Sequence, residues 1–391
     1  MNFDNGKDTV LYFGNEWGAD NRTSSHHIAS RLMRDYNFVY IESPGLRSPQ
    51  LNRHDVFRIF KKLAQIFKKK RVIDTTTFVK TLYQVPFHNI PFIKYVNSAM
   101  VKWQVRKICR KNHITKPILW CVLPHVADVL DSVESKCCVY YIVDDFSEMP
   151  GVNKKYISVM DERLCKKSDV VFVTSEPLYK TKSCFGDKVH INKHGVDYEH
   201  FNKAINRDMP VPPQVANLKA PVIGFFGLIE EWIDLEVIKM MAVHHPDWNF
   251  LMIGRVAVDN SEFDNISNVS FIGSVSYEEL PAYAQLFDVS LIPVVNNELI
   301  RNFNPLKLRE YLAMGQPVVT AQFPELEEFS DYIYASDNHQ QFESDVARAM
   351  DENTPEKRLA RAKSVEGSSW ENRYQNVNGI LRSSINSKEN R

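Results

Sequence analysis

Several features that mark whole classes of protein are missing from this chain of 391 residues. It contains no G-x-x-x-x-G-K-[ST] loop, no G-x-S-x-G elbow and no H-E-x-x-H motif. These absences argue against P-loop nucleotide hydrolysis, serine-hydrolase chemistry and a helical zinc site. No apolar run approaches the roughly 18 to 20 residues that span a bilayer. The start of the chain also lacks the basic and apolar regions of a signal peptide, so we expect a cytoplasmic protein.

Cysteine is scarce and unpatterned. The chain has six cysteines, none in C-x-x-C spacing, and Cys137 and Cys138 are adjacent in an apolar run. This favours reduced core thiols over disulfides or a metal site, and we expect no bound metal and no cofactor.

Short apolar runs alternate with longer helix-compatible segments in two series. The strands expected in the first series are Val10–Phe13, Phe38–Ile41, Ile118–Val122, Val139–Val143, Val170–Thr174 and Val189–Asn192. Those of the second series are Val222–Phe226, Phe250–Ile253, Val269–Ile272, Val289–Pro293 and Val318–Thr320. Such runs predict parallel sheets covered on both faces.

The two series predict an α/β protein of two doubly wound, Rossmann-like domains that face each other across a cleft. The expected boundaries are residues 1–203 for the first domain and 222–385 for the second, with a frayed tail at 386–391. Residues 204–221 are rich in proline and small polar residues and are predicted to be the interdomain linker. Near the end of the first domain, His194 and Asp197 are expected to order the junction rather than to react.

The segment Asn304–Val319, NPLKLREYLAMGQPVV, predicts a short helix with both ends marked. Asn304 is expected to cap it, Pro305 fits its first position and Gly315 suits a left-handed end. The start of such a helix attracts anions. Lys307 and Glu310 lie one turn apart on one face. Lys307 could neutralise a diphosphate there, and Glu310 could accept hydrogen bonds from sugar hydroxyls. An ordinary capped helix with a Lys–Glu pair is the alternative.

Three glycines stand at the ends of successive expected strands of the second domain. Gly227, Gly254 and Gly273 each follow an apolar run directly. A glycine at this point lets the backbone approach a ligand closely. Together they predict a crevice onto which the Asn304 helix should open.

The first domain offers two further candidates. Asp144 and Asp145 follow the run Val139–Val143, where a carboxylate could act as a base or cap the segment from Ser147. The loop GNEWGADNRTSSHH after the first strand could hold an acceptor. Its candidate residues are Gly14, Arg22, His26 and His27.

Residues 51–116 carry sixteen Lys or Arg and two acids, a local balance of +14. DVFRIFKKLAQIFKKKR (residues 55–71) places phenylalanines on one helical face and lysines around the rest, and residues 92–111 repeat this character. A basic amphipathic helix is typical of an anionic membrane surface. A surface helix packed on its own domain is the alternative, and no nucleic-acid module is evident, so we expect no nucleic-acid partner.

Several of these motifs together resemble the GT-B glycosyltransferases, in particular the group that makes teichuronic acid and exopolysaccharides. They are NPLKLREYLAMGQPVV, HGVDYEHF, IGFFGLIEEWIDLE, NVSFIGSVSYEELPAYAQLFDVSLIPV and NRTSSHHIASRL. The resemblance implies a hexosyltransferase-type enzyme that moves a sugar from a nucleotide-diphosphate sugar, most simply a UDP-sugar, to a glycan. It further implies cell-envelope polysaccharide biosynthesis, with a lipid-linked acceptor and a peripheral location on the inner face of the cell membrane.

The resemblance also assigns roles within the chain. The first domain would bind the acceptor and the second the nucleotide sugar. Lys307 would hold the diphosphate, Glu310 the ribose hydroxyls, and Gly227 would approach the phosphates. The remaining implied donor contacts are Gly254, Gly273, Ser274, Asn304, Pro305 and Leu306. In YYIVDDF, Asp144 resembles the general base of the xanthan glucuronosyltransferase, although adjacent Asp145 is open as an alternative.

One position departs from the pattern of many retaining relatives. They carry a glutamate eight residues before the residue matching Glu310, whereas this chain has Asn302. The stereochemistry of transfer is therefore left open between inversion and retention. Two other functions are also possible, a GT-B nucleotide-sugar epimerase and a catalytically silent scaffold in a polysaccharide synthase complex.

Overall fold

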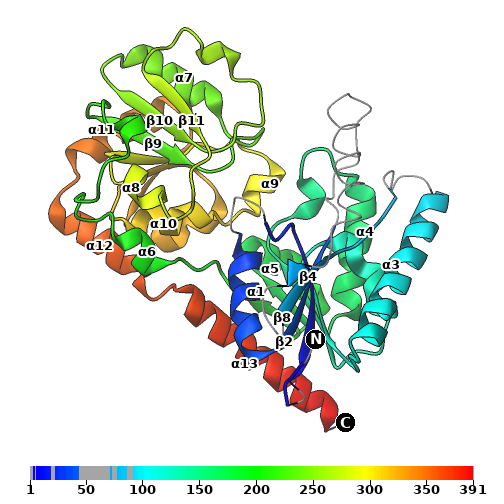
Figure 1. Cartoon of the computed structure of the whole chain (residues 1–391). Helices are drawn as coiled ribbons and strands as arrows, with labels where there is room; N and C mark the ends of the chain where they lie inside the picture. The colour runs from blue at the N-terminus through cyan, green and yellow to red at the C-terminus, as the bar shows by residue number, and fades with distance from the viewer. Residues whose placement is uncertain are drawn as a thin grey trace. The chain divides into compact units, whose positions relative to one another are not determined.

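The computed structural model describes residues 3–4, 6–18, 23–43, 71–72, 77–85 and 91–390. Within these, the chain forms two compact units. Unit 1 holds the described residues up to Lys193 together with those from Tyr374 onward, and unit 2 spans His194–Arg373. Each unit has one sheet with helices, so the predicted α/β class is confirmed (Figure 1).

The sheet of unit 1 has eight strands in the order β3-β4-β2-β1-β5-β6-β7-β8, parallel except for the β3–β4 pair. Its strands are β1 Thr9–Gly14, β2 Asn37–Glu42, β3 Arg71–Val72, β4 Thr77–Thr81, β5 Ile118–Cys121, β6 Cys137–Ile142, β7 Val170–Val173 and β8 Val189–Ile191. Its helices and short 3₁₀ turns are α1 Ser24–Asp35, α3 Pro91–Lys111, η1 Pro124–Asp131, η2 Phe146–Glu148, α4 Lys154–Lys167, α5 Glu176–Lys182 and η3 Ser183–Phe185. Strands β1, β2, β5, β6 and β7 are buried along most of their length, as an apolar run without alternation requires.

Unit 2 has a six-stranded parallel sheet in the order β11-β10-β9-β12-β13-β14. The strands are β9 Val222–Phe226, β10 Asn249–Ile253, β11 Val269–Gly273, β12 Val289–Ile292, β13 Val318–Ala321 and β14 Ile333–Ser336. The helical elements are α6 Tyr198–Asn202, η4 Pro213–Val215, α7 Leu235–His244, η5 Ser261–Phe263, α8 Leu280–Ala284, α9 Glu298–Arg301, α10 Leu306–Ala313, η6 Pro324–Phe329, α11 His339–Asp351 and α12 Pro355–Glu366. All strands expected from the sequence are present, and β3, β4 and β14 are additional.

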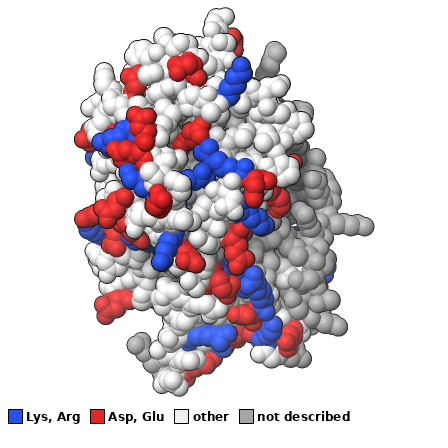
Figure 2. Space-filling view, turned by 90° about the vertical axis from the view of Figure 1, so that its left-hand side faces the viewer, with Lys and Arg blue, Asp and Glu red and all other residues white. Residues whose placement is uncertain are grey.

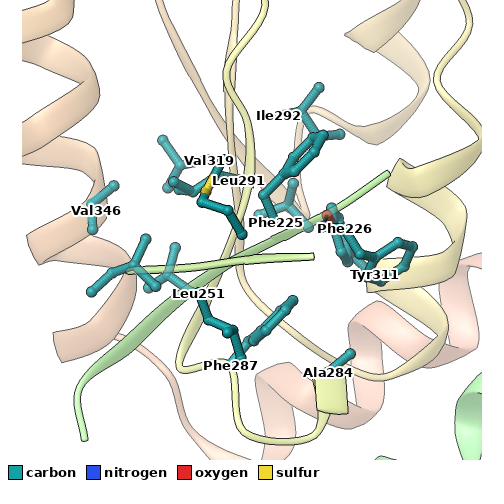
Figure 3. Close-up of a cluster of buried hydrophobic side chains, with 14 of the residues drawn as sticks. Phe225, Phe226, Leu251, Ala284, Phe287, Leu291, Ile292, Tyr311, Val319 and Val346 are labelled. Atoms are coloured by element: carbon teal, nitrogen blue, oxygen red, sulfur yellow. Dashed lines mark hydrogen bonds between the residues drawn. The ribbon is translucent and has the colours of Figure 1, made fainter. Parts of the chain in front are cut away.

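The core of unit 2 fixes α10 against the sheet. Tyr311 points from α10 to β9, where its ring meets Phe226 edge-on at 4.7 Å between centroids (Figure 3). The backbone N–H of Phe226 donates to Tyr311 Oη at 2.9 Å. Tyr311 is fully buried. Because both the ring and its hydroxyl are engaged, the helix has little freedom to slide along the strand.

The predicted linker is part of unit 2. Met209 exchanges two hydrogen bonds of 2.9 Å with the side chain of Gln285, and Arg207 forms an ion pair with Asp288 at 2.8 Å. The interdomain linker predicted at residues 204–221 is therefore corrected, because this proline-rich stretch forms hydrogen bonds and an ion pair with side chains of unit 2. The chain passes between the units at residues 193/194 and 373/374 instead. The end of the first domain, predicted at residue 203, therefore lies at residue 193.

The end of the chain is helical. Helix α13 (Trp370–Glu389), red in Figure 1, begins in unit 2 and continues on unit 1. Tyr36 donates to Asn378 Oδ1 at 2.6 Å, and Lys388 pairs with Asp169 at 2.8 Å. The predicted second-domain end at residue 385 and the frayed tail at 386–391 are therefore corrected for the residues up to Glu389. Polar contacts with unit 1 hold a segment whose composition alone suggested fraying.

His194 and five of the six cysteines are buried. The buried His194 ring lies 6.3 Å from that of Trp370, beside the passage between the units. None of the six cysteines is in a disulfide, and only Cys184 is exposed. Burial raises the pKa of the Cys109 thiol to about 11, so this thiol stays protonated at neutral pH.

Candidate functional site

Helix α10 begins one residue later than the sequence suggested. Its N-cap is Pro305, and Asn304 is not a cap but a buried residue before the helix. The expected left-handed end is confirmed, since Gly315 has φ +73°. Gly315 N–H donates to Leu312 O at 2.8 Å and Gln316 N–H to Tyr311 O at 3.1 Å, which is a Schellman motif. The C-terminal end of the helix is therefore fixed by backbone hydrogen bonds.

The three strand-end glycines lie at the ends of adjacent strands, which backbone hydrogen bonds join there. Gly227 N–H donates to Ile253 O at 2.8 Å, and Gly254 N–H donates to Gly273 O at 2.7 Å. All three glycines have positive φ, of +139°, +136° and +75°. A side chain at Gly254 would overlap the carbonyl of Gly227. The backbone at the ends of β9 and β10 is therefore packed too closely to admit a side chain at Gly254.

Lys307 extends from the first turn of α10 across Gly227. A Cβ atom at Gly227 would overlap Lys307 Cε, and Lys307 Nζ lies 5.5 Å from the centre of the Phe225 ring. The ammonium is thereby held at the helix start, next to the carboxyl end of β9. Both the helix dipole and this charge favour an anion here.

Glu310 is partly buried one turn after Lys307. Burial raises its pKa from 4.5 to about 7, the Lys307 ammonium opposes this rise, and the Asp197 carboxylate adds to it. The carboxyl group therefore changes protonation near neutral pH. When ionised it can accept hydrogen bonds from ligand hydroxyls, and when protonated it can donate one. Of the other predicted donor contacts, Leu306 is partly exposed, Pro305 is buried and Ser274 is exposed.

Beneath the start of α10 lies a buried polar cluster that the sequence did not reveal. Arg309 is 0% exposed, and its Nη1 donates to Asn304 Oδ1 at 2.7 Å. Asn304 Nδ2 in turn donates to Glu325 Oε1 at 3.2 Å. An arginine between Leu308 and Glu310 looks like a solvent-facing residue in sequence. Only the tertiary structure shows that it lies on the buried side.

The two adjacent aspartates of unit 1 have different surroundings. Asp145 is the N-cap of η2, and its Oδ1 accepts hydrogen bonds from Ser147 N at 3.2 Å and Ser147 Oγ at 2.7 Å. Asp144 lies directly after β6 and is partly exposed. The capping function that the sequence allowed for this pair thus belongs to Asp145.

The predicted acceptor residues of unit 1 are largely used to hold the chain. His26 Nδ1 accepts from Thr23 N–H at 3.2 Å, and its Nε2 lies 3.0 Å from the Glu16 carbonyl oxygen. Because Nδ1 is an acceptor, Nε2 carries the proton and donates. His27 is buried, and a side chain at Gly14 would overlap the Tyr40 hydroxyl. Arg22 lies outside the described residues.

Among the described ranges no group of three or more His, Cys, Asp or Glu residues could hold a metal ion. Within the same ranges no helix is long and apolar enough to cross a membrane. Residues 55–70 of the first amphipathic segment lie outside the described residues, and its last residue, Arg71, belongs to β3. The second is helix α3, whose start and end match the prediction closely.

Comparison with known proteins finds a glycosyltransferase match within unit 2. Residues 220–352 match the family "Glycosyl transferases group 1". Over 190 residues the chain is 31% identical to a protein of Bacillus subtilis (strain 168) named as the teichuronic acid biosynthesis glycosyltransferase TuaH. That match covers 46% of this chain and 47% of TuaH, so the chain spans about half the length of this relative.

Solved structures match over nearly the whole chain. Sucrose-phosphate synthase from Thermosynechococcus elongatus has a TM-score of 0.71 at 12% identity, covering 97% of this chain and 100% of that one. Anabaena HepE in complex with UDP and glucose has a TM-score of 0.65 at 12% identity, covering 96% and 100%. The chain thus has the GT-B fold and carries a glycosyltransferase group 1 domain, which confirms the family resemblance seen in the sequence.

Proposed function

We propose that this glycosyltransferase chain moves a sugar from a nucleotide-diphosphate sugar, most simply a UDP-sugar, to a lipid-linked glycan of the cell envelope. One observation carries the proposal. Within residues 220–352, the Lys307 side chain crosses Gly227 at the start of α10, with Glu310 on the same face. This arrangement offers positive charge for a diphosphate and a carboxylate for hydroxyl groups.

Unit 2 acts on the donor. As the bond between sugar and diphosphate breaks, negative charge accumulates on the leaving phosphate. The first N–H groups of α10 and the Lys307 ammonium stabilise that charge. Glu310, ionised, accepts hydrogen bonds from the ribose hydroxyls, and the Gly273–Ser274 turn flanks the base.

Unit 1 acts on the acceptor. Asp144 takes the proton from the attacking acceptor hydroxyl, because it stands at the carboxyl end of a central parallel strand, where ligands bind in such sheets. Asp145 is a weaker candidate for the base, because its Oδ1 already accepts hydrogen bonds from Ser147 N and Ser147 Oγ.

Helix α3 supplies the contact with an anionic membrane on the cytoplasmic side. It contains six Lys or Arg and no acid. Phe92, Tyr95 and Trp103 on it are 75%, 76% and 60% exposed, while Val101 and Val105 on its other side are buried. By contrast, the face of the molecule seen in Figure 2 has acidic and basic side chains interspersed. Exposed aromatics beside unbalanced positive charge favour a lipid surface.

The donor assignment is tested with purified protein and a panel of UDP-, GDP- and dTDP-sugars. We expect one donor to raise the melting temperature and to be hydrolysed slowly, and Lys307→Ala to lower this hydrolysis about 100-fold without unfolding the chain. Lys203→Ala, an exposed lysine of unit 2, is the control. Near-normal hydrolysis by Lys307→Ala contradicts the assignment. Epimerised donor would favour the epimerase, and binding of no donor would favour the silent scaffold.

The membrane contact is tested by co-sedimentation with phosphatidylglycerol vesicles. Changing Lys102, Lys107 and Arg110 of α3 to Ala should weaken binding about tenfold or more. The matched control replaces three exposed lysines of α4 and α5 in the same unit, Lys155, Lys166 and Lys180. Equal losses in both triple variants, or none in the α3 variant, would overturn the role of α3.

A further inference from the structure

The buried Arg309 places a positive charge beneath the start of α10. Side chains of a helix lean toward its N-terminus, and Arg309 follows this rule by reaching back to Asn304, two residues before the first helical residue. The guanidinium therefore lies at the same end of the helix as Lys307. Glu325 completes the chain of contacts by accepting from Asn304 at 3.2 Å.

The carboxylates of Glu328 and Glu325 lie near this charge and offset only part of the effect of its desolvation. The nearest carboxylate, Glu328, is 3.6 Å from Arg309 Nη2, and its side chain is 40% exposed. Arg309 Nε and Nη2 have no hydrogen-bond acceptor among the described residues, and the guanidinium stacks over the Phe329 ring at 5.0 Å. A buried arginine held in this way lowers folding stability, because its contacts compensate for only part of the hydration that it loses.

We infer that Arg309 is a positioning residue for the donor diphosphate. Its buried charge strengthens the hold on the anion at the start of α10, and its hydrogen bond to Asn304 fixes the backbone from which the helix begins. In a low-dielectric interior a charge acts over a longer distance than in water, so contact with the ligand is unnecessary. This inference rests on the proposed donor site.

The test compares the affinity for a nucleoside diphosphate with that for its nucleoside by calorimetry. UDP, GDP and dTDP are screened on the wild-type protein first, and binding of none of them defeats the proposed function itself. With the diphosphate that binds, Arg309→Gln should lower affinity about tenfold and leave the nucleoside affinity within about twofold. Arg309→Lys, which keeps the charge, should restore most of the diphosphate affinity. A folded Arg309→Gln variant with unchanged diphosphate affinity, or with equal losses for both ligands, overturns the inference.

A second variant decides the question if Arg309→Gln does not fold. Glu328 is on the surface, so Glu328→Gln should fold, and it removes the carboxylate nearest to Arg309. We expect the diphosphate to bind about threefold more tightly and the nucleoside to bind as before. Glu327→Gln, an exposed change of equal charge on the same short helix, should leave both affinities unaltered. Weaker or unchanged diphosphate binding by Glu328→Gln, or equal gains in both variants, overturns the inference.

Discussion

The two units differ in how their polar residues near the carboxyl ends of the strands are used. In unit 2, Gly227 leaves space that the Lys307 side chain occupies, and Glu310 is held partly buried where its pKa is raised. In unit 1, His26 and Asp145 are engaged in holding the backbone of their own loops. In unit 2, ionisation of the partly buried Glu310 carboxyl group thus lowers folding stability, and a ligand that binds there would compensate for it. In unit 1, His26 and Asp145 instead stabilise their own loops. A polar side chain at the carboxyl end of a strand can therefore be a structural residue, and its local hydrogen bonds distinguish that function from ligand binding.

The largest expected effect concerns Asp144, the proposed general base in unit 1. Asp144→Asn should lower kcat for sugar transfer about 100- to 10,000-fold, because the acceptor hydroxyl loses its base. Asp145→Asn should lose less activity and reduce stability by about 1 kcal/mol, because it weakens a cap. Steady-state kinetics and thermal unfolding of both variants measure this. The reverse order of activity loss would assign the base to Asp145.

Gly227→Ala should have the next largest effect. The new methyl group would overlap Lys307 Cε, and φ of +139° is unfavourable for alanine. We expect donor turnover to fall about tenfold or more, together with a loss of stability. Gly186→Ala of unit 1, at φ +81° with no neighbouring atom within 4 Å, is the control for backbone strain alone. Its turnover should be unchanged, and equal turnover in the two variants would contradict the role of Gly227.

Local signals predicted the fold well and the site in part. Apolar runs located the strands, and Gly315 located the end of α10, because these signals depend on neighbours in sequence. The start of α10 was misplaced since Asn304, a good cap in isolation, is drawn into the buried cluster around Arg309. The domain boundary was misplaced because the contacts of Arg207 and Met209 join residues more than 70 positions apart. No local pattern contains that information.

A smaller effect is expected for His26→Ala. Loss of its contacts with Thr23 and the Glu16 carbonyl should lower stability by about 1 to 2 kcal/mol. Because both ring nitrogens are engaged by the chain, KM for the acceptor should stay within about twofold. Thermal unfolding and acceptor titration measure the two quantities. A raised acceptor KM with unchanged stability would show that His26 contacts the acceptor. The difference drawn between the two units would then not hold for this residue.

The smallest expected effect is a pH-dependent gain in stability for Glu310→Gln. Burial raises the pKa of Glu310 to about 7, so between about pH 4.5 and 7 the folded chain keeps a proton that the unfolded chain has released. Folding stability from this group is therefore full at low pH and is lost as the pH rises through this window. Glutamine cannot ionise, so the variant should match the wild type at pH 5 and melt about 2–4 °C higher at pH 8, for roughly 1 kcal/mol. Glu356→Gln, an exposed carboxyl of unit 2, should show no such gain. If Glu310→Gln melts at the wild-type temperature at both pH values, the ionised carboxylate carries no cost, and the claim that unit 2 holds a strained group for its ligand fails.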